Sequence, residues 1–324
     1  MNTFGNRFKI TLFGASHSPA FGVIIKGCPA GVALDEKVFE IDLTRRKAGA
    51  MGTTSRVEAD VPNIETGCAN GYTTGAPIKI VFENRNIRPE DYEPFKSQPR
   101  PGHADWVARQ KYGDAVDLSG GGIFSGRMTL PLTAAGVVAK HLLKKEHPNM
   151  GISARLLEAG GSADITKAVQ EAQAVGDSIG GLIECTVTGV PVGWGEPFFD
   201  SVESIISHLV FAIPGIKGIE FGVGFAAAWM QGSRCNDCYI DAQGHTATNH
   251  AGGIHGGITN GNELIFRVAA KPTPSISRIQ ETFDFVAHKM APLEMIGRHD
   301  TCFALRLPVV VEAVTAVALV NFIR

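Results

Sequence analysis

Hydrophobic and polar residues alternate in several short stretches of the chain, a pattern typical of half-buried strands. The pattern predicts strands at Arg7–Phe13, Phe21–Lys26, Ile78–Glu83, Ile152–Ala159, Leu182–Val190 and Glu263–Ala270. Ile219–Trp229 is apolar at both alternations, and it predicts a strand that is buried on both faces.

Other stretches repeat their apolar residues at the spacing of a helix. This spacing predicts helices at Asp35–Lys47, Trp106–Lys111, Leu132–Lys145, Thr166–Val175 and Val202–Phe211. Thr301–Phe322 is expected to begin as strand or loop and to become helical from about Val311, with Glu312 in the helix.

The order of these elements favours an α+β fold. Strands and helices do not alternate regularly, as they would in a doubly wound sheet, and several neighbouring strands are suited to hairpin pairing. We therefore expect antiparallel sheets with helices between them. The sequence contains no strict internal repeat and no low-complexity linker, so residues 1–324 are expected to form a single domain.

Composition narrows the possible partners. The net charge is −2, which gives no general polybasic surface, so we expect neither nucleic acid nor membrane as a partner. The first ten residues lack the apolar run of a signal peptide. Val309–Leu319 is apolar but is interrupted by Glu312 and is too short to cross a bilayer. We expect a soluble, cytoplasmic protein.

The six cysteines are scattered, which favours reduced thiols over a disulfide framework. Cys235 and Cys238 are close together and are followed by His245 and His250, a set of ligands that suits zinc. The spacing from Cys238 to His245 is shorter than in common zinc fingers. A zinc-stabilised oligomeric module remains an alternative, but we expect no metal.

The stretch from Arg100 to Thr129 concentrates groups that suit an anionic ligand. Three consecutive glycines, Gly120–Gly122, permit close approach of the backbone to a ligand. Ser125 and Arg127 follow them and add a hydroxyl and a guanidinium group. His103 titrates near neutral pH, so the same stretch can support proton transfer.

Three further loops combine small residues with acid, base or cationic groups. They are Gly14–Ser18, which contains His17, the glycine-rich Asn249–Gly261, and Gly297–Cys302. The sequence has no phosphate-binding P-loop motif, dinucleotide fingerprint or nucleophile elbow. Phosphate-loop triphosphatases and serine hydrolases therefore have no support from the sequence.

Together these motifs resemble the chorismate synthase family over nearly the whole chain. G-A-S-H-S at Gly14–Ser18 is similar to the family's G-E-S-H-G, and R-P-G-H-A-D at Arg100–Asp105 matches directly. G-G-G-I-F-S-G-R-M-T at Gly120–Thr129 is similar to G-G-G-R-S-S-A-R-E-T. The other matches, in family order, are Asn249–Gly261, K-P-T-P-S at Lys271–Ser275 and G-R-H-D at Gly297–Asp300.

The resemblance implies a lyase that eliminates phosphate (anti-1,4) from 5-enolpyruvylshikimate 3-phosphate to form chorismate, in aromatic amino-acid biosynthesis. It implies reduced FMN without net redox change, an external flavin reductant and an association with NADP. It also implies a homotetramer and a four-layer β-α-α-β sandwich with antiparallel sheets around central helices.

The resemblance also implies roles for individual residues. The catalytic candidates are His17, His103, Asp300, Ser16 and Ser125. The substrate-anion candidates are Arg46, Arg100, Arg127 and Arg298. The flavin-contacting candidates are Ser125, Pro214, Gly215, Gly256, Lys271, Pro272, Thr273, Pro274, Ser275 and Arg298. Taken singly, His17 or His103 is more often a hydrogen-bonded structural histidine, and the other residues are compatible with structural roles such as a turn cap or a solvated helix end.

Several positions depart from the family pattern. Ala15 replaces a glutamate, Ile123 and Phe124 stand where the family has Arg-Ser, and Gly52 lies where a second basic residue is expected. Arg56 is a candidate to supply that charge from a shifted position. These departures motivate a second hypothesis, a paralogue that binds flavin or shikimate-type anions with weak or no turnover.

Overall fold

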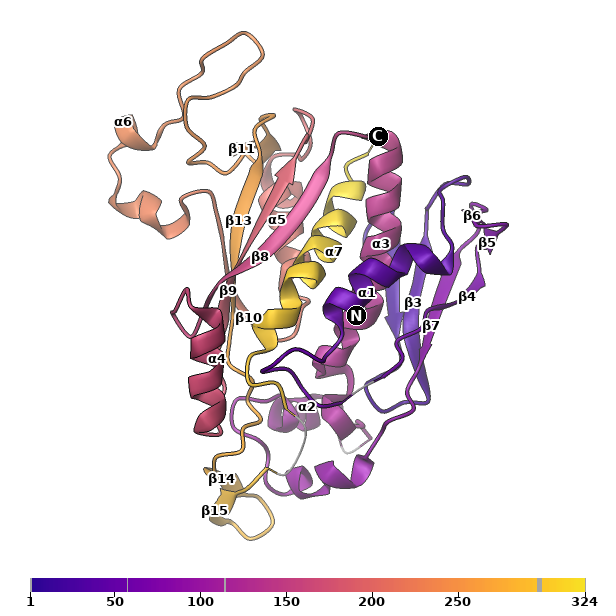
Figure 1. The fold of residues 1–324 in the computed structure, drawn as a ribbon, viewed down its shortest axis with the longest axis vertical. Helices are drawn as coiled ribbons and strands as arrows, with labels where there is room; N and C mark the ends of the chain where they lie inside the picture. Colours follow the sequence, from indigo (N-terminus) through magenta and orange to yellow (C-terminus); the bar gives the residue numbers. More distant parts are fainter. Residues whose placement is uncertain (1, 57, 114, 296–298, 324) are drawn as a thin grey trace.

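The computed structural model describes residues 2–323 except 57, 114 and 296–298. Two antiparallel sheets enclose two layers of helices (Figure 1). The first sheet has the order β1-β2-β3-β7-β4, with β1 Thr3–Phe4, β2 Lys9–Phe13, β3 Ala20–Lys26, β7 Ile78–Glu83 and β4 Asn63–Thr66. The second has the order β10-β13-β9-β8, with β10 Ile216–Phe221, β13 Leu264–Ala270, β9 Gly181–Thr188 and β8 Gly151–Ala159.

The central layers contain α3 (Thr129–Glu146) and α7 (Leu307–Val320), which pack against each other. Helix α3 contacts β3 and β7 of the first sheet, whereas α7 contacts β8 and β9 of the second. The expected four-layer β-α-α-β arrangement is therefore confirmed. Helix α1 (Glu40–Arg46), preceded by η1 (Glu36–Phe39), contacts both central helices, and α5 (Val202–Val210) contacts α7 and β10.

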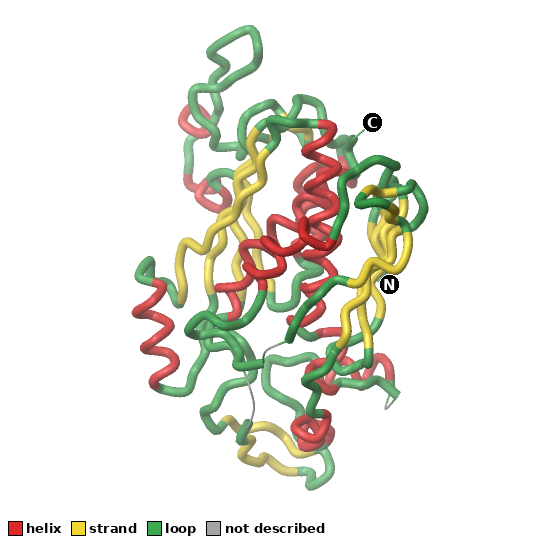
Figure 2. The backbone as a smooth tube through the Cα atoms, turned by 45° about the vertical axis from the view of Figure 1, so that its right-hand side comes forward, coloured by secondary structure: helices red, strands yellow, loops and turns green. Residues whose placement is uncertain are grey.

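The remaining elements lie around this sandwich (Figure 2). Helix α2 (Asp105–Tyr112), the 3₁₀ segment η2 (Pro89–Lys96) and the hairpin β14–β15 (Gln280–Asp284, Lys289–Leu293) lie at one end. The short helix α6 (Gly232–Cys235) lies in a long segment that projects from the opposite end. The fold also contains helix α4 (Ile165–Ala174) and two small hairpins, β5–β6 (Cys68–Ala69, Tyr72–Thr73) and β11–β12 (Ile254–His255, Ile258–Thr259). The short 3₁₀ turns are η3 (Ser119–Phe124), η4 (Gly126–Met128), η5 (Phe198–Asp200), η6 (Gly224–Trp229) and η7 (Phe303–Arg306).

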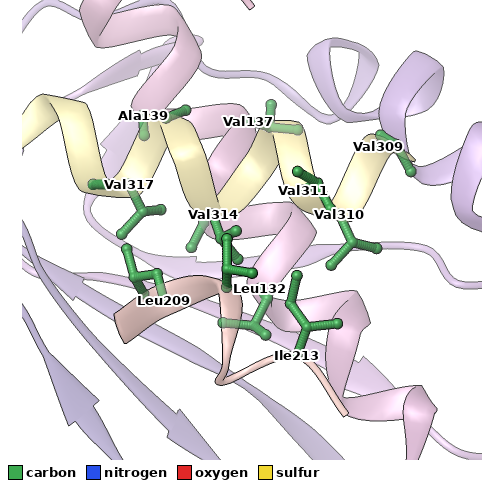
Figure 3. Close-up of a cluster of buried hydrophobic side chains, with 14 of the residues drawn as sticks. Leu132, Val137, Ala139, Leu209, Ile213, Val309, Val310, Val311, Val314 and Val317 are labelled. Atoms are coloured by element: carbon green, nitrogen blue, oxygen red, sulfur yellow. The ribbon is translucent and has the colours of Figure 1, made fainter. Parts of the chain in front are cut away.

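The apolar core is centred on α7, which is buried along almost its entire length. Figure 3 shows Val310, Val314 and Val317 of α7 among side chains that include Leu209 of α5 and Ile213. Close packing of α3 on α7 depends on Gly136, because a Cβ there would lie 2.2 Å from the Cβ of Ala313.

A buried ionic network crosses the same layers. Glu312 of α7 accepts two hydrogen bonds of 2.7 Å from Arg45 of α1 and one of 2.8 Å from Lys140 of α3. It also accepts a bond of 2.9 Å from the backbone nitrogen of Ala154 in β8. Burial raises the pKa of Glu312, but the partners prevail, and its pKa lies below the ordinary value. The carboxylate therefore ties four elements together.

Phe303–Val320 has the length and the mean hydropathy, 2.0, of a helix that could cross a membrane. This corrects the expectation that the apolar stretch is too short. However, 78% of the segment is buried inside the molecule, where it forms the core helix.

Two predicted elements were wrong in part. Ile219–Trp229 is not one strand: β10 ends at Phe221, and η6 follows, with Phe225 73% and Trp229 83% exposed. The prediction of a buried strand was wrong for the second half of this apolar stretch, because these residues pack against little of their own chain. The last helix begins at Leu307 rather than near Val311; Pro308 fits there because the first turn of a helix needs no donor from it.

Candidate active site

A cavity of about 530 Å³ lies where both central helices begin. Gly126 and Arg127 precede α3, Phe303 and Arg306 precede α7, and all four residues line it. The positive ends of two helix dipoles thus lie at this region, which favours negative charge. The volume falls within the range usual for small-molecule sites.

The cavity wall is predominantly cationic. Among the described residues, cationic side chains outnumber carboxylates by seven to three. The cations are Arg46, Lys47, Arg56, Arg100, Arg127, Lys271 and Arg306, and the carboxylates are Glu58, Asp60 and Asp300. This excess suits a ligand with several negative charges, because guanidinium groups bind carboxylates and phosphates in bidentate geometry.

Arg100, His103 and Asp105 form one buried cluster at the start of α2. Arg100 donates to Asp105 from Nε (2.8 Å) and Nη2 (2.7 Å). His103 Nδ1 lies 2.6 Å from the same carboxylate, so its Nδ1–H donates and its Nε2 carries the free lone pair. Burial raises the pKa of Asp105, but its hydrogen bonds with Arg100 and His103 outweigh burial and hold that pKa well below its usual range.

The pKa of His103 is lowered from its ordinary value. Burial is the largest cause, Asp105 opposes it, and the positive charges of Arg100 and Lys271 add to it. His103 is therefore mainly neutral at pH 7. A neutral imidazole with a free Nε2, held by a carboxylate, is suited to accept a proton.

The three glycines of η3 lie between the two histidines. Gly120 and Gly121 both have positive φ, +61° and +85°. A Cβ on Gly120 would lie 2.1 Å from the ring of His17, and one on Gly121 would lie 3.4 Å from Nε2 of His103. The loop can approach the ring of His17 only because Gly120 has no side chain, whereas a Cβ on Gly121 would make an ordinary contact with His103.

Ser16 and His17 are buried behind the cavity wall and do not themselves line the cavity in the described chain. His17 Nδ1 lies 3.2 Å from the hydroxyl of Ser16, which accepts a bond of 3.3 Å from Arg56. The ring of Tyr92 meets His17 edge-on at 5.2 Å between centroids. Arg56 and Tyr92, which contact this pair, both line the cavity.

Asp300 lines the cavity on the side of α7. It accepts hydrogen bonds from the backbone nitrogen of Thr54 (2.9 Å) and from Arg306 (3.0 Å). His299 beside it has a pKa lowered by burial and by the charge of Arg100. Its Nε2 is buried and has no partner in the described structure. Arg298, expected to bind substrate and flavin, lies outside the described residues.

The segment Lys271–Ser275 forms another wall with Pro214 and Gly215. The backbone nitrogen of Lys271 donates to the carbonyl of Gly215 (2.9 Å), and Nζ donates to Gly102 (2.6 Å). The hydroxyl of Ser275 accepts from Arg100 (3.3 Å), whereas that of Thr273 is buried without a partner within the described chain. An unsatisfied buried hydroxyl here is available to a ligand.

Two remaining candidates differ in position. Ser125 lines the cavity and caps η4, its hydroxyl accepting a bond of 3.3 Å from the backbone nitrogen of Arg127. Gly256 lies in the turn of the β11–β12 hairpin and, within the described chain, is not part of the cavity wall. The cavity therefore brings together all the described candidates except Ser16, His17 and Gly256.

The departures from the family pattern also differ in their consequences. Ile123 and Phe124 line the cavity, so apolar side chains stand where Arg-Ser is expected. Gly52 has φ +83°, and a Cβ there would lie 2.3 Å from Val169 of α4. A basic side chain therefore does not fit at position 52, whereas Arg56 does reach the cavity.

Sequence reasoning missed several residues of the site. Glu58, Asp60, Tyr92, Phe303 and Arg306 all line the cavity. The alternating charges of Arg56, Glu58 and Asp60 were the available signal, but they resemble an ordinary solvated stretch.

The zinc alternative gains no support, since nowhere in the described parts of the chain do three or more histidine, cysteine or carboxylate side chains gather as metal ligands.

Comparison with known proteins gives a consistent result. A family model described as chorismate synthase matches residues 8–323. A protein named chorismate synthase from Chitinophaga pinensis is 55% identical over 322 residues, which cover 99% of this chain and 96% of the relative. One of the same name from Korarchaeum cryptofilum is 40% identical over 350 residues, covering 99% and 96%. A crystal structure of chorismate synthase has a TM-score of 0.76 at 22% identity, covering 98% of this chain and 92% of that chain, and is similar in fold.

Proposed function

The chain belongs to the chorismate synthase family, whose members eliminate phosphate from 5-enolpyruvylshikimate 3-phosphate to form chorismate, and we propose that the cationic cavity is the active site. The observation that carries the proposal is His103, held through Nδ1 by the carboxylate of Asp105 in a wall rich in arginine. Residues 1–324 act as one domain in this proposal, in line with the match over residues 8–323.

Reduced FMN is the proposed cofactor. Pro214, Gly215, Ser125 and the segment Lys271–Ser275 hold it, with Arg298, and the unpartnered hydroxyl of Thr273 supports a polar ligand at this wall. When bound, the flavin supplies electron density as phosphate leaves, without net redox change. An external reductant maintains it, with NADP as the associated nucleotide. Gly256 is the one proposed flavin contact that lies outside the described cavity wall.

The substrate is a multiple anion, and the cavity offers matching donors. Arg46, Arg100 and Arg127 are buried and held in place by carboxylates, so their remaining donors are preorganised for carboxylate and phosphate groups. Charge develops on the phosphate as its bond to the ring breaks, and fixed donors stabilise that charge without reorganising. Arg298 is proposed to bind the same substrate.

Proton transfer is assigned to the two histidines and Asp300. His103 accepts or returns a proton through Nε2 at pH 7, where its lowered pKa leaves the ring neutral. His17 acts from behind the wall through Ser16, which Arg56 contacts at 3.3 Å. Asp300 assists deprotonation from the opposite wall, and Ser125 donates a hydrogen bond to substrate or flavin.

An anaerobic assay with 5-enolpyruvylshikimate 3-phosphate and photoreduced FMN tests this proposal. Formation of chorismate is the expected result, and the assay should respond to both components. Flavin binding without chorismate would overturn the assignment and favour the paralogue with weak or no turnover. Ile123 and Phe124 motivate that second possibility, because they replace polar contacts in the cavity wall.

We further propose that the enzyme is a cytoplasmic homotetramer. Exposed aromatic side chains in the projecting segment and beside it support association, because surfaces of this kind are usually covered in an assembly. They include Phe198, Phe199, Phe225 and Trp229.

A further inference from the structure

A carboxylate is buried in the wall of a cavity that otherwise favours anions. The side chain of Asp60 is only 4% exposed. Its Oδ2 lies 3.0 Å from Nη1 of Arg46, and its Oδ1 lies 2.9 Å from Nη1 of Arg127. One carboxylate thus joins two guanidinium groups that come from distant parts of the sequence.

Each arginine has a second anchor. Nε of Arg46 donates to the hydroxyl of Thr129 (3.2 Å), and Nε of Arg127 donates to the side-chain oxygen of Asn84 (2.7 Å). Arg127 also lies over the ring of Phe21, 4.9 Å from its centroid. A planar group held at two of its nitrogens has a fixed orientation, so the direction of the third nitrogen is determined.

The third nitrogen of Arg127 remains available. Nη2 is buried and has no hydrogen-bond partner in the described structure, although Arg127 lines the cavity. A buried donor without a partner is costly unless a ligand or water satisfies it. This orphaned donor therefore indicates where an anionic group binds.

Asp60 also keeps the two cations compatible with each other. Burial, together with repulsion from Arg306 and Arg127, lowers the pKa of Arg46 to about 10, and Asp60 opposes this effect. Asp60 itself has φ +51°, a conformation that non-glycine residues rarely adopt and that is often found near functional sites. Both observations fit a residue that is kept in place by its two partners.

We propose that Asp60 is a positioning residue, which clamps Arg46 and Arg127 so that their remaining donors bind one anionic group of the substrate. The inference rests on the proposed function of the cavity. Asp60 does not touch the substrate, because both of its oxygens face arginines. It acts by setting the geometry and the charge of the two groups that do.

The test compares Asp60→Asn with Glu312→Gln. Glu312 is a matched control, since it is equally buried, 4% exposed, and also holds two cations, but it lies in the core and is not part of the described cavity wall. Titration calorimetry measures the Kd of 5-enolpyruvylshikimate 3-phosphate for each variant in the presence of oxidised FMN. We expect Asp60→Asn to weaken binding roughly tenfold to a hundredfold, since Arg46 and Arg127 are no longer held in position and one of their charge-assisted contacts with the substrate is lost. Glu312→Gln should lower Tm but leave the Kd of the folded protein within about twofold.

A double-mutant cycle with Arg127→Ala separates positioning from a general structural effect. If Asp60 acts through Arg127, Asp60→Asn must change the Kd less in the Arg127→Ala background than in the wild type. Equal fold-changes in both backgrounds, or a Kd for Asp60→Asn within twofold of wild type, would overturn the clamp.

Two further outcomes are decisive. If Asp60→Asn does not fold, Asp60→Glu is tested in its place, because this variant keeps the charge but displaces the carboxylate. Weaker substrate binding by Asp60→Glu would support the clamp, and unchanged binding would overturn it. If the wild type itself does not bind 5-enolpyruvylshikimate 3-phosphate, the proposed function fails and the clamp fails with it. If the wild type binds 5-enolpyruvylshikimate 3-phosphate and the Asp60 variant binds it equally well, the clamp is rejected while the proposed function stands.

Discussion

At the scale of single residues, the chemistry of His103 is set by its neighbours. Asp105 fixes the tautomer, burial lowers the pKa, and Gly121 leaves room beside Nε2. The sequence identified His103 and Arg100, which lie in one motif, but it gave no role to Asp105 of the same motif. It could not identify Asp60 or Tyr92, whose roles depend on groups that only the folded chain brings within reach.

Replacing His103 with alanine should reduce turnover about 10²- to 10⁴-fold, because general acid–base catalysis contributes a factor of this size. His141→Ala is the matched control. His141 is another partly buried histidine with a pKa lowered by burial, but it lies on α3 away from the cavity. Steady-state rates of chorismate formation measure both. A wild-type rate for His103→Ala would exclude it from the mechanism.

Asp105→Asn should destabilise the protein by about 3–5 kcal/mol at pH 7, because it leaves the buried charge of Arg100 without its partner. The pKa of Asp105 is depressed in the folded state, so its stabilisation is present above its unfolded pKa, about 3.9, and is lost as pH falls through the folded value. Urea unfolding from pH 7 to pH 3 should therefore show the wild type and the variant converging only below about pH 4. A difference that is constant with pH would contradict this account.

At the scale of elements, the apolar pattern located α3, α4 and α5 to within a few residues; α4 and α5 each have one face against the core, whereas α3 is buried on all sides over most of its length. Strand alternation was equally informative for β3, β7 and β13, each of which pairs on both sides within a sheet. Hydropathy gave a wrong prediction of one buried strand for Ile219–Trp229, since an apolar residue does not show whether it is buried by its own chain. The β14–β15 hairpin was missed because its strands carry little apolar alternation.

The contact between α3 and α7 leads to a prediction at Gly136. Alanine is the better helix former by about 1 kcal/mol, yet Gly136→Ala should lower the free energy of unfolding by about 1–3 kcal/mol, because its methyl group meets Ala313. Gly232→Ala is the control: a Cβ there meets nothing within 4 Å, and the change should be neutral or stabilising. Denaturant unfolding measures both. A stabilised Gly136→Ala variant would show that the helices can move apart without cost.

At the scale of the whole molecule, the sandwich places the cavity at one end and the projecting segment at the other. The central helices begin at the cavity, whereas the segment with α6 projects from the opposite end (Figure 1). The layer order followed from resemblance to a family and not from periodicity, because alternation does not specify how two sheets face each other. The proposed assembly is likewise a property that no local pattern determines.

Trp229→Ser should weaken the proposed homotetramer, because it removes a large apolar side chain that is 83% exposed in the single chain. Val286→Ser is the control, as Val286 is 76% exposed but lies in the β14–β15 hairpin. Light scattering after size-exclusion chromatography gives the mass. The expected result is a smaller species for Trp229→Ser alone. A monomeric wild type would contradict the tetramer, and an unchanged Trp229→Ser variant would remove this surface from the interface.

The central claim, that one cationic cavity eliminates phosphate with a flavin that is not consumed, is tested most directly by stoichiometry. Wild-type protein is incubated anaerobically with excess 5-enolpyruvylshikimate 3-phosphate and a substoichiometric amount of photoreduced FMN, and chorismate and inorganic phosphate are quantified together. The account predicts equal amounts of the two products, both far exceeding the reduced flavin added. Phosphate released without chorismate, or product limited to the amount of reduced flavin, would contradict it.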